Sequence, residues 1–331
     1  MKIAFFGTGE FSKSILEGIL SYDDIDVALI VSQPDKPVGR KKEILSTPVK
    51  ALALEKNIEV LQPEKLKPSP QPFPQKAGQE QISVFYKKLR DLNLDFIVVV
   101  AYGKIVPKEV LEAPKHGCIN LHGSILPAYR GASPIQESIK AGDTKTGLTV
   151  MYMSEGMDEG DILSIGEVEI DITDKTPDIF NKSVDIGPSL LVKTLKGVLD
   201  GTVKAIPQDD SQATYCSKIE KQDGEINFET QTAKEIYDRF RAYYPWPGIY
   251  TYYKGKKFAI EDCVFDKTDL SGDEELKAGD VVEIEEDHKK QIGVICKLGI
   301  LILKQVKLEG KKTMDILSFV NGNKEFLDYK F

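Results

Sequence analysis

The first half of the chain alternates short apolar runs with amphipathic segments, and this alternation limits the fold more than any other feature. The run "DFIVVVAYG", Asp95–Gly103, is apolar on both faces, which is typical of a central parallel strand covered on each side. Repeated strand–helix pairs predict right-handed βαβ units and an α/β fold with a doubly wound, Rossmann-like, mostly parallel sheet. We expect strands at Lys2–Gly7, Asp26–Ser32, Ile58–Gln62, Asp95–Gly103, Gly117–Gly123 and Gly147–Met153, and helices at Glu10–Leu20, Thr47–Lys56 and Ala132–Ala141.

The last third of the chain has a different pattern. A polar stretch, Gly201–Gln212, is followed by a predicted helix at Ala233–Ala242 and then by short strands that turn signals separate, up to about residue 308. This pattern favours a small, OB-like β-barrel. We therefore predict a catalytic domain at 1–200, a linker at 201–212 and a C-terminal domain at 213–331.

A proline-rich stretch interrupts the first half. Lys67–Gln81 has a proline at every second position from Pro68 to Pro74. The composition predicts a polyproline-like surface insertion outside the sheet.

Composition narrows the classes of protein to consider. The 331 residues suffice for two ordinary domains, and no apolar run approaches the roughly 18 residues of a membrane span. Four scattered cysteines and the lack of a signal-peptide pattern predict a cytoplasmic protein. The net charge of −8 argues against bulk electrostatic binding of nucleic acid but allows a local basic patch.

Two motifs suggest functions that their details disfavour. "GTGEFS" from Gly7 resembles a dinucleotide-binding turn but has Ser12 in place of the third glycine, and the next strand ends in "SQPD" without an acid at its tip. In "HGCINLH", His116 and His122 would lie about 20 Å apart along a strand, too far to share one ion. We expect neither a nicotinamide cofactor nor a metal.

The stretch "GCINLHG" places polar side chains in a predicted buried strand. Asn120 and His122 share one face, about 6.6 Å apart, near the carboxyl edge of the sheet where ligands bind. The acidic turn "SEGMDEGDI" presents Asp158, which would raise the pKa of His122 if the two are paired. An amide, an imidazolium and a carboxylate suit acyl transfer to an amine. The alternative is a pair of polar groups hydrogen-bonded for structural reasons alone.

A short basic cluster follows the second strand. "GRKKE", Gly39–Glu43, also lies at the carboxyl edge of a predicted parallel strand. Such a cluster is either a solvated loop or part of a ligand site.

Several motifs, in order along nearly the whole chain, resemble the methionyl-tRNA formyltransferase family. They are "SQPDKPVGR", "TPVK", "VVVAYGKIVP", "GCINLHGSILPAYRG", "GMDEGDI" and "YYPWPG". The resemblance implies transfer of a formyl group from 10-formyltetrahydrofolate to the α-amine of methionine on initiator tRNA, for translation initiation. It implies catalytic roles for Asn120, His122 and Asp158, without a metal.

The resemblance also implies a folate site. A turn would bind the folate with a cis peptide bond between Leu126 and Pro127, and has Ile125 where the family usually has Leu. Two further loops would line an apolar pterin pocket. The implied folate-binding residues are Ser124, Ile125, Leu126, Pro127, Tyr102, Gly103, Lys104, Ile105, Val106, Glu155, Gly156 and Met157.

Basic residues are implied to contact the tRNA. Arg40, with Lys41 and Lys42, would reach the acceptor end, although the family often has "GRGKK" where this chain has "GRKKE". C-terminal lysines would contact the phosphate backbone, which gives affinity without reading sequence. These lysines are Lys256, Lys257, Lys311 and Lys312. We expect the enzyme to be a monomer.

Other functions remain open on the residues alone. The same catalytic trio serves a formyl-folate hydrolase, a glycinamide ribonucleotide formyltransferase and sugar-amine formyltransferases. Outside this superfamily, a nicotinamide-dependent dehydrogenase and a non-catalytic RNA-binding protein are alternatives.

Overall fold

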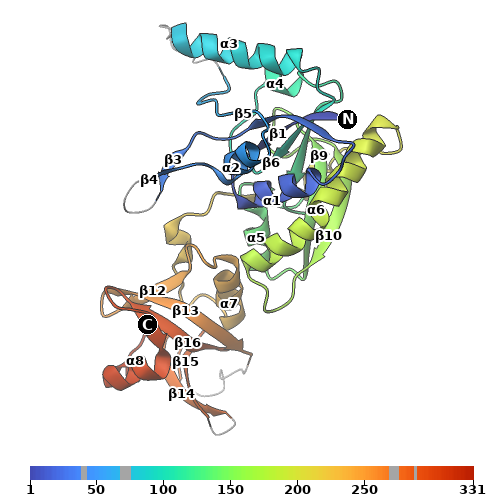
Figure 1. Ribbon diagram of the computed structural model, residues 1–331. Helices are drawn as coiled ribbons and strands as arrows, with labels where there is room; N and C mark the ends of the chain where they lie inside the picture. Colours follow the sequence, from blue (N-terminus) through green and yellow to red (C-terminus); the bar gives the residue numbers. More distant parts are fainter. Residues whose placement is uncertain (39–42, 68–75, 268–275, 287–288) are drawn as a thin grey trace. The chain divides into compact units, whose positions relative to one another are not determined.

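The computed structural model describes the chain except for residues 39–42, 68–75, 268–275 and 287–288 (Figure 1). The chain forms two compact units. The first unit comprises Met1–Pro134, Lys145–Glu169 and Phe180–Ser217, and the second comprises Ile135–Thr144, Ile170–Ile179 and Lys218–Phe331. Residues 201–212, predicted to be a linker, therefore lie in the first unit; the proposed domain boundaries remain a prediction.

The first unit is built on a seven-stranded sheet with the order β10-β9-β7-β6-β1-β2-β5. Its strands are β1 (Lys2–Gly7), β2 (Asp26–Val31), β5 (Val60–Leu61), β6 (Phe96–Val100), β7 (Cys118–His122), β9 (Lys145–Tyr152) and β10 (Ile162–Glu169). The five strands from β7 to β5 are mutually parallel, whereas β9 runs antiparallel to β7 and β10 antiparallel to β9. The mostly parallel, doubly wound sheet is as predicted.

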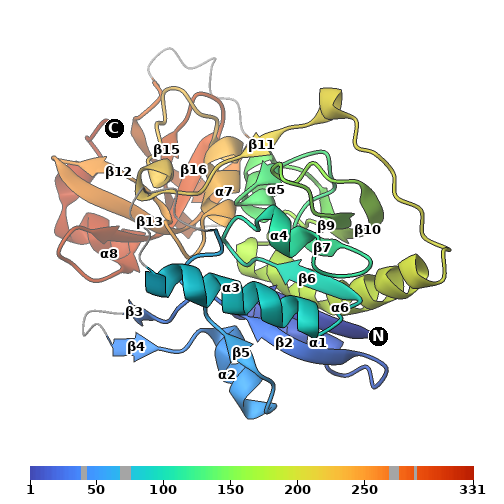
Figure 2. The same ribbon diagram turned by 90° about the horizontal axis from the view of Figure 1, so that it is seen from above.

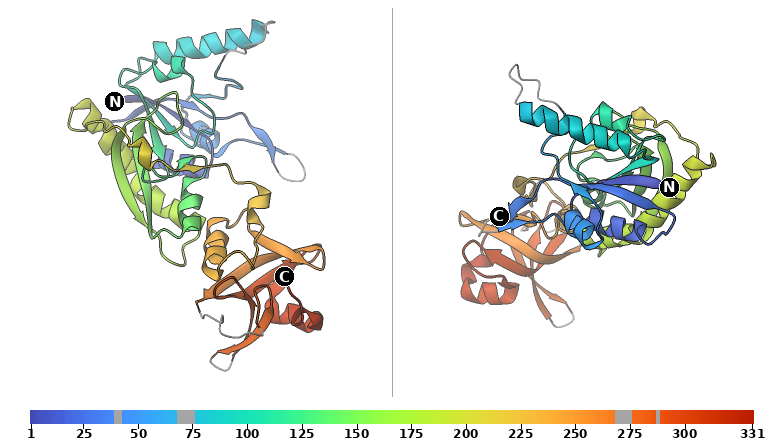
Figure 3. Two further views of the ribbon diagram at one scale, coloured as in Figure 1. Left: turned by 180° about the vertical axis from the view of Figure 1, so that it is seen from behind. Right: turned by 45° about the horizontal axis from the view of Figure 1, so that its top comes forward.

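Apolar side chains cover both faces of this sheet. Ile3 and Phe5 of β1 point into one core with α1, α2 and α6, whereas Ala4 and Phe6 point into the opposite core with α3 and α4. Figures 2 and 3 show α3 on the face away from α6. The helices of the first unit are α1 (Glu10–Ile19), α2 (Pro48–Glu55), α3 (Lys76–Asp91), α4 (Lys108–Leu111) and most of α6 (Thr176–Leu199). Helix α5 (Pro134–Ala141) lies almost wholly in the second unit.

Helix α3 corrects part of the polyproline prediction. The helix begins at Lys76, so the last residues of the predicted insertion, 76–81, are helical. Phe85 and Leu89, four residues apart, are buried against the sheet, and this helical spacing favours α3 over an extended segment. Pro68–Pro74 lie outside the described residues.

The second unit contains an antiparallel sheet with the order β12-β13-β16-β15-β14, and β17 pairs with β16. Its strands are β12 (Ile249–Tyr253), β13 (Lys256–Asp266), β14 (Val281–Glu286), β15 (Lys289–Ile295), β16 (Ile300–Leu308) and β17 (Met314–Asp315). Helices α7 (Ala233–Ala242) and α8 (Ile316–Gly322) contribute to its core. This arrangement agrees with the predicted small barrel. In the part of the chain that the structure describes, no helix has the length and apolar character needed to cross a membrane.

Candidate active site

Strand β7 presents Asn120 and His122 on one face. Ile119 and Leu121 point into the core with Ile3, whereas Cys118 packs in the opposite core, so Asn120 and His122 share the side of Cys118. The strand ends at His122, and its neighbour β6, which runs parallel to it, ends at the same edge. The pair therefore lies at the carboxyl edge of the sheet.

His122 is 5% exposed and has an acceptor on each side of its ring. Its Nε2 lies 3.0 Å from the carbonyl oxygen of Tyr129, and its Nδ1 lies 3.6 Å from Oδ2 of Asp158. Nε2 therefore carries a hydrogen and donates it to Tyr129. The longer distance to Asp158 is that of an ion pair when His122 is protonated, and exceeds that of a good hydrogen bond.

Two features position the Asp158 carboxylate: the backbone conformation of Asp158 itself and a hydrogen bond from Gly131. Its Oδ2 accepts a hydrogen bond of 2.9 Å from the backbone N–H of Gly131. Asp158 has a φ of +53°, a left-handed conformation that Asp tolerates better than most residues. Loop conformation and hydrogen bond together direct the carboxylate towards His122.

The direction of the pKa shift of His122 differs from the prediction. Burial lowers the pKa of His122 below its ordinary value, and the opposing effects of the Asp158 charge and the Tyr129 carbonyl do not reverse that direction. The expected influence of Asp158 is present but weaker than desolvation. A lowered pKa favours the neutral ring, whose Nδ1 then carries no hydrogen.

Asn120 is half-buried and pairs in register with Val99 on one side and Met151 on the other. Its side-chain amide makes no hydrogen bond to any residue that the structure describes. The amide is therefore available to donate to a bound molecule.

The turn after β7 is fixed to β9. Thr149 Oγ1 donates to the carbonyl of Ser124 at 2.7 Å and accepts from the N–H of Leu126 at 3.1 Å. Ser124 Oγ donates to the carbonyl of Ala128 at 2.6 Å. The peptide bond between Leu126 and Pro127 is cis, as the resemblance implied.

The two other predicted folate loops expose some side chains and bury others. Tyr102 and Val106 are buried, and burial raises the pKa of Tyr102 to about 12. Ile105 and Met157, in contrast, are 77% and 64% exposed. Exposed apolar side chains on these loops can cover an apolar ligand, whereas Tyr102 and Val106 support the loop from within.

The predicted tRNA-binding residues fall into two groups. Arg40, Lys41 and Lys42 lie outside the described residues; they follow β3 (Lys36–Val38) and precede β4 (Glu43–Leu45), which pair antiparallel. In the second unit, the registers of β13 and β16 join Lys257 to Glu309, whose N–H donates to the Lys257 carbonyl. This pairing brings the neighbouring Lys256, Lys311 and Lys312, all exposed, to one end of the sheet.

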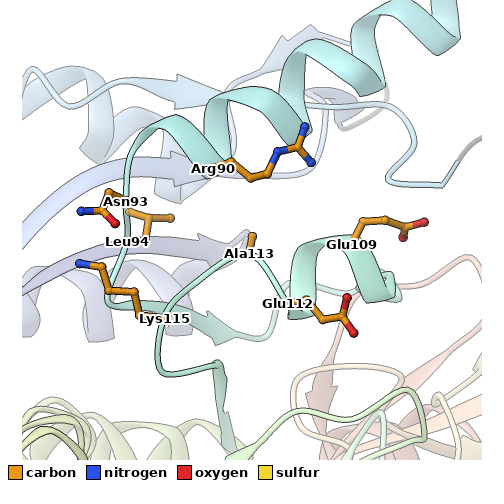
Figure 4. A pocket seen from close by; sticks show the side chains of 7 residues that line it. All are labelled: Arg90, Asn93, Leu94, Glu109, Glu112, Ala113 and Lys115. Carbon is orange, nitrogen blue, oxygen red and sulfur yellow. The ribbon is translucent and has the colours of Figure 1, made fainter.

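Figure 4 shows a pocket elsewhere on the first unit. It is lined by Arg90, Asn93, Leu94, Glu109, Glu112, Ala113 and Lys115, from α3, α4 and nearby loops. None of the predicted site residues lines it, and its charges are of both signs. We do not assign the active site to it. Within the described residues, no three metal-ligating side chains converge.

Residues that the sequence did not suggest hold the site together. Strand β8 (Arg130–Gly131) pairs in parallel with β11 (Tyr215–Cys216), and Gln208 donates to the carbonyls of Asp158 and Gly160. These partners are about 50 and 85 residues apart in the chain, and the polar composition of 201–212 gave no signal of them.

Comparison with known proteins adds a second line of observation. A family model described as formyl transferase matches residues 1–195, and one described as formyl transferase, C-terminal domain, matches residues 218–324. The chain is 41% identical to the methionyl-tRNA formyltransferase of Caldicellulosiruptor saccharolyticus over 326 residues, which cover 98% of this chain and 97% of that protein. It is 40% identical to that of Lachnospira eligens over 324 residues, 98% of this chain and 97% of the other.

Solved structures share the fold at lower identity. A sugar 3N-formyltransferase, crystallised in the presence of dTDP and 5-N-formyl-THF, has a TM-score of 0.61 and 19% identity, covering 94% of this chain and 99% of its own. An N-formyltransferase from Helicobacter canadensis, in complex with folinic acid and dTDP-3-aminofucose, has a TM-score of 0.62 and 18% identity, covering 92% and 98%. These matches show the formyltransferase fold.

Proposed function

We propose a specific reaction for this chain, which belongs to the methionyl-tRNA formyltransferase family. The enzyme transfers the formyl group of 10-formyltetrahydrofolate to the α-amine of methionine esterified to initiator tRNA, for translation initiation. The observation that carries this proposal is the arrangement of Asn120, His122 and Asp158 at the carboxyl edge of a formyltransferase sheet, with His122 Nδ1 3.6 Å from Asp158.

Three side chains divide the chemistry. The folate supplies the formyl carbon that the methionyl amine attacks. The free Asn120 amide donates to the formyl oxygen as negative charge develops there. Neutral His122 accepts the proton released by the amine at Nδ1, and Asp158 stabilises the imidazolium that forms. That proton then passes through water to the folate nitrogen as its bond to the formyl carbon breaks.

This assignment revises the expected role of His122. A histidine protonated throughout would donate to the developing oxyanion, but the pKa of His122 is lowered and Nε2 already donates to Tyr129. A neutral ring with an unprotonated Nδ1 beside Asp158 is instead suited to act first as a base.

Folate and tRNA are assigned to different surfaces. The turn from Ser124 to Pro127, with the loops 102–106 and 155–157, binds the folate. The C-terminal lysines contact tRNA phosphates, and a local patch serves this purpose on a chain of net charge −8. Arg40 and the two lysines after it are assigned to the acceptor end. We place the enzyme in the cytoplasm, as a monomer.

A choice of acceptors tests the proposal. The chain is given 10-formyltetrahydrofolate with charged initiator tRNA, with charged elongator tRNA, or with no acceptor. We expect formyl-methionine on the initiator alone. Formate released without an acceptor would instead identify a formyl-folate hydrolase, and formylation of a sugar amine but no tRNA would identify a sugar-amine enzyme.

A further inference from the structure

Gln208 lies in the segment 196–217, between the two ranges that match family models. Its side chain nevertheless contacts the loop that carries Asp158. Nε2 donates to the carbonyl of Asp158 at 2.9 Å and to that of Gly160 at 2.7 Å. Both donor positions of the amide are thereby used on this loop.

The other end of the same amide contacts Arg130. Gln208 Oε1 accepts from Nε of Arg130 at 3.0 Å and from Nη2 at 2.8 Å. Arg130 is 1% exposed, and its Nη2 also donates to Asp210 at 2.7 Å. Because carbonyl oxygens face Nε2 and guanidinium hydrogens face Oε1, the orientation of the Gln208 amide is fixed.

The backbone on either side of Arg130 contacts both catalytic side chains. The Tyr129 carbonyl accepts from His122, and the Gly131 N–H donates to Asp158. Strand β8 and the residue before it thus touch the Asp158 carboxylate and His122 directly, and reach the Asp158 backbone through Arg130 and Gln208.

Strand β8 is in turn fixed by β11. The N–H of Arg130 donates to the Thr214 carbonyl at 2.8 Å, and that of Ala132 donates to the Cys216 carbonyl at 3.2 Å. The N–H of Tyr129 donates to Thr214 Oγ1 at 2.8 Å. The segment 208–216 therefore contacts the site through both its backbone and its side chains.

We propose that Gln208 and Arg130 are positioning residues that set the separation between His122 and Asp158, with support from the backbone of Thr214 and Cys216. The kinetic part of this proposal rests on the function proposed above. Asp158 has a left-handed backbone conformation, and the Gln208 amide supplies two hydrogen bonds to its loop. Displacements of about 1 Å in a catalytic group can cost about 100-fold in rate.

Three variants separate the roles of these hydrogen bonds. Gln208→Glu keeps the acceptors for Arg130 but places an oxygen against the carbonyls of Asp158 and Gly160. Gln208→Met has a similar length and removes both sets of hydrogen bonds without adding charge. Asp210→Asn is the matched control: it removes the charge of an Arg130 partner that is 81% exposed and leaves Gln208 intact.

For the Gln208→Glu and Gln208→Met variants, we expect kcat to fall about 10-fold to 100-fold with KM for either substrate changed less than about twofold, because positioning is lost and binding is kept. Asp210→Asn should keep the wild-type kcat. The second readout is the pKa of His122 from NMR titration, which is practicable because the chain has only three histidines. Asp158 faces Nδ1 and the Tyr129 carbonyl faces Nε2, so withdrawal of the Asp158 charge should lower that pKa further.

The proposal is overturned if folded Gln208→Met protein has wild-type kcat and an unchanged His122 pKa. If neither Gln208 variant folds, the role is structural and the proposal also fails. A wild-type chain that does not formylate methionyl-tRNA would refute the proposed function, but the His122 titration would still decide whether Gln208 positions Asp158.

Discussion

The two halves of the candidate catalytic centre are held in different ways. Asn120 and His122 are placed by the two-residue period of one buried strand, whereas Asp158 is placed by hydrogen bonds from Gly131 and Gln208, distant in the chain. A strand buried in two apolar cores leaves its polar face little freedom. A loop with a left-handed residue depends on outside contacts. This difference predicts that changing the side chain of Asn120 or His122 lowers the reaction rate directly. The position of Asp158, in contrast, should depend on the residues that hydrogen-bond to its loop.

The largest effect is expected from truncating the strand pair. Asn120→Ala or His122→Ala should each lower kcat about 10²–10³-fold, a typical cost of removing one group that acts on developing charge. Single-turnover formylation with saturating tRNA measures this step. Wild-type turnover by both variants would remove β7 from the mechanism.

Asp158→Asn should have a smaller effect of a different kind. Replacing the carboxylate by an amide keeps the length of the side chain but removes the stabilisation of the imidazolium, so kcat should fall about 10-fold to 100-fold. Circular dichroism and thermal unfolding check that the loop change has not unfolded the protein. A loss as large as that of His122→Ala would mean that Asp158 does more than stabilise charge.

The pH profile sharpens the same distinction. Because burial lowers the pKa of His122 and we propose the neutral ring as the base, kcat/KM should rise with pH through an inflection below the ordinary histidine value of about 6.5, and stay high above it. Asp158 favours the protonated ring, so Asp158→Asn should move the inflection to lower pH. If the inflection moves to higher pH, or if activity falls as His122 loses its proton, His122 would instead act in its protonated form, as a donor to the developing oxyanion.

The sequence predicted the strand pair but not the supports of the loop, for a physical reason. The alternation of Ile119, Asn120, Leu121 and His122 is local and can be read from neighbouring residues. The hydrogen bonds of Gln208 depend on how the chain returns after α6, and no local pattern encodes that path. Likewise, the burial that lowers the pKa of His122 depends on the whole core. An argument from the neighbouring carboxylate alone therefore predicted a raised pKa.

The same difference applies to secondary structure. Six of the seven strands in the main sheet of the first unit, all except β10, were predicted, as was α7, because their periodicity is strong. The first turns of α3 were not predicted, because prolines up to Pro74 dominated the composition around them. Strand β9 has the apolar run of a parallel strand, yet pairs antiparallel with β7. Strand direction follows from connections, which a run of apolar residues does not specify.

Thr149→Val tests the hydrogen bonds that hold the turn after β7 to strand β9. The hydroxyl is buried and bridges Ser124 and Leu126, so the isosteric change should lower the free energy of unfolding by about 1–3 kcal/mol through unpaired backbone groups. Urea unfolding measures this cost. The affinity for formyl-folate should weaken with it, since the turn it anchors is assigned to that ligand; unchanged folate affinity would separate the turn from the binding site.

The smallest effect is expected in the second unit. There, as at β7, the pairing of strands determines where the residues lie. Lys256, Lys311 and Lys312 lie at one end of the sheet because β13 and β16 pair, and we assign each to a phosphate. Changing all three to alanine should weaken tRNA binding at low salt. The slope of log affinity against log salt should also become shallower, by about 0.9 for each phosphate that a lysine no longer neutralises, if duplex RNA behaves like B-DNA.

The folate KM and the intrinsic rate on bound tRNA should not change in this triple variant, because the lysines lie far in sequence and in a different unit from Asn120 and His122. Lys254→Ala is the control, since that lysine is already paired with Glu325. If the salt slope of the triple variant equals that of the wild type, these lysines do not contact the tRNA phosphates, although they lie at one end of the same sheet.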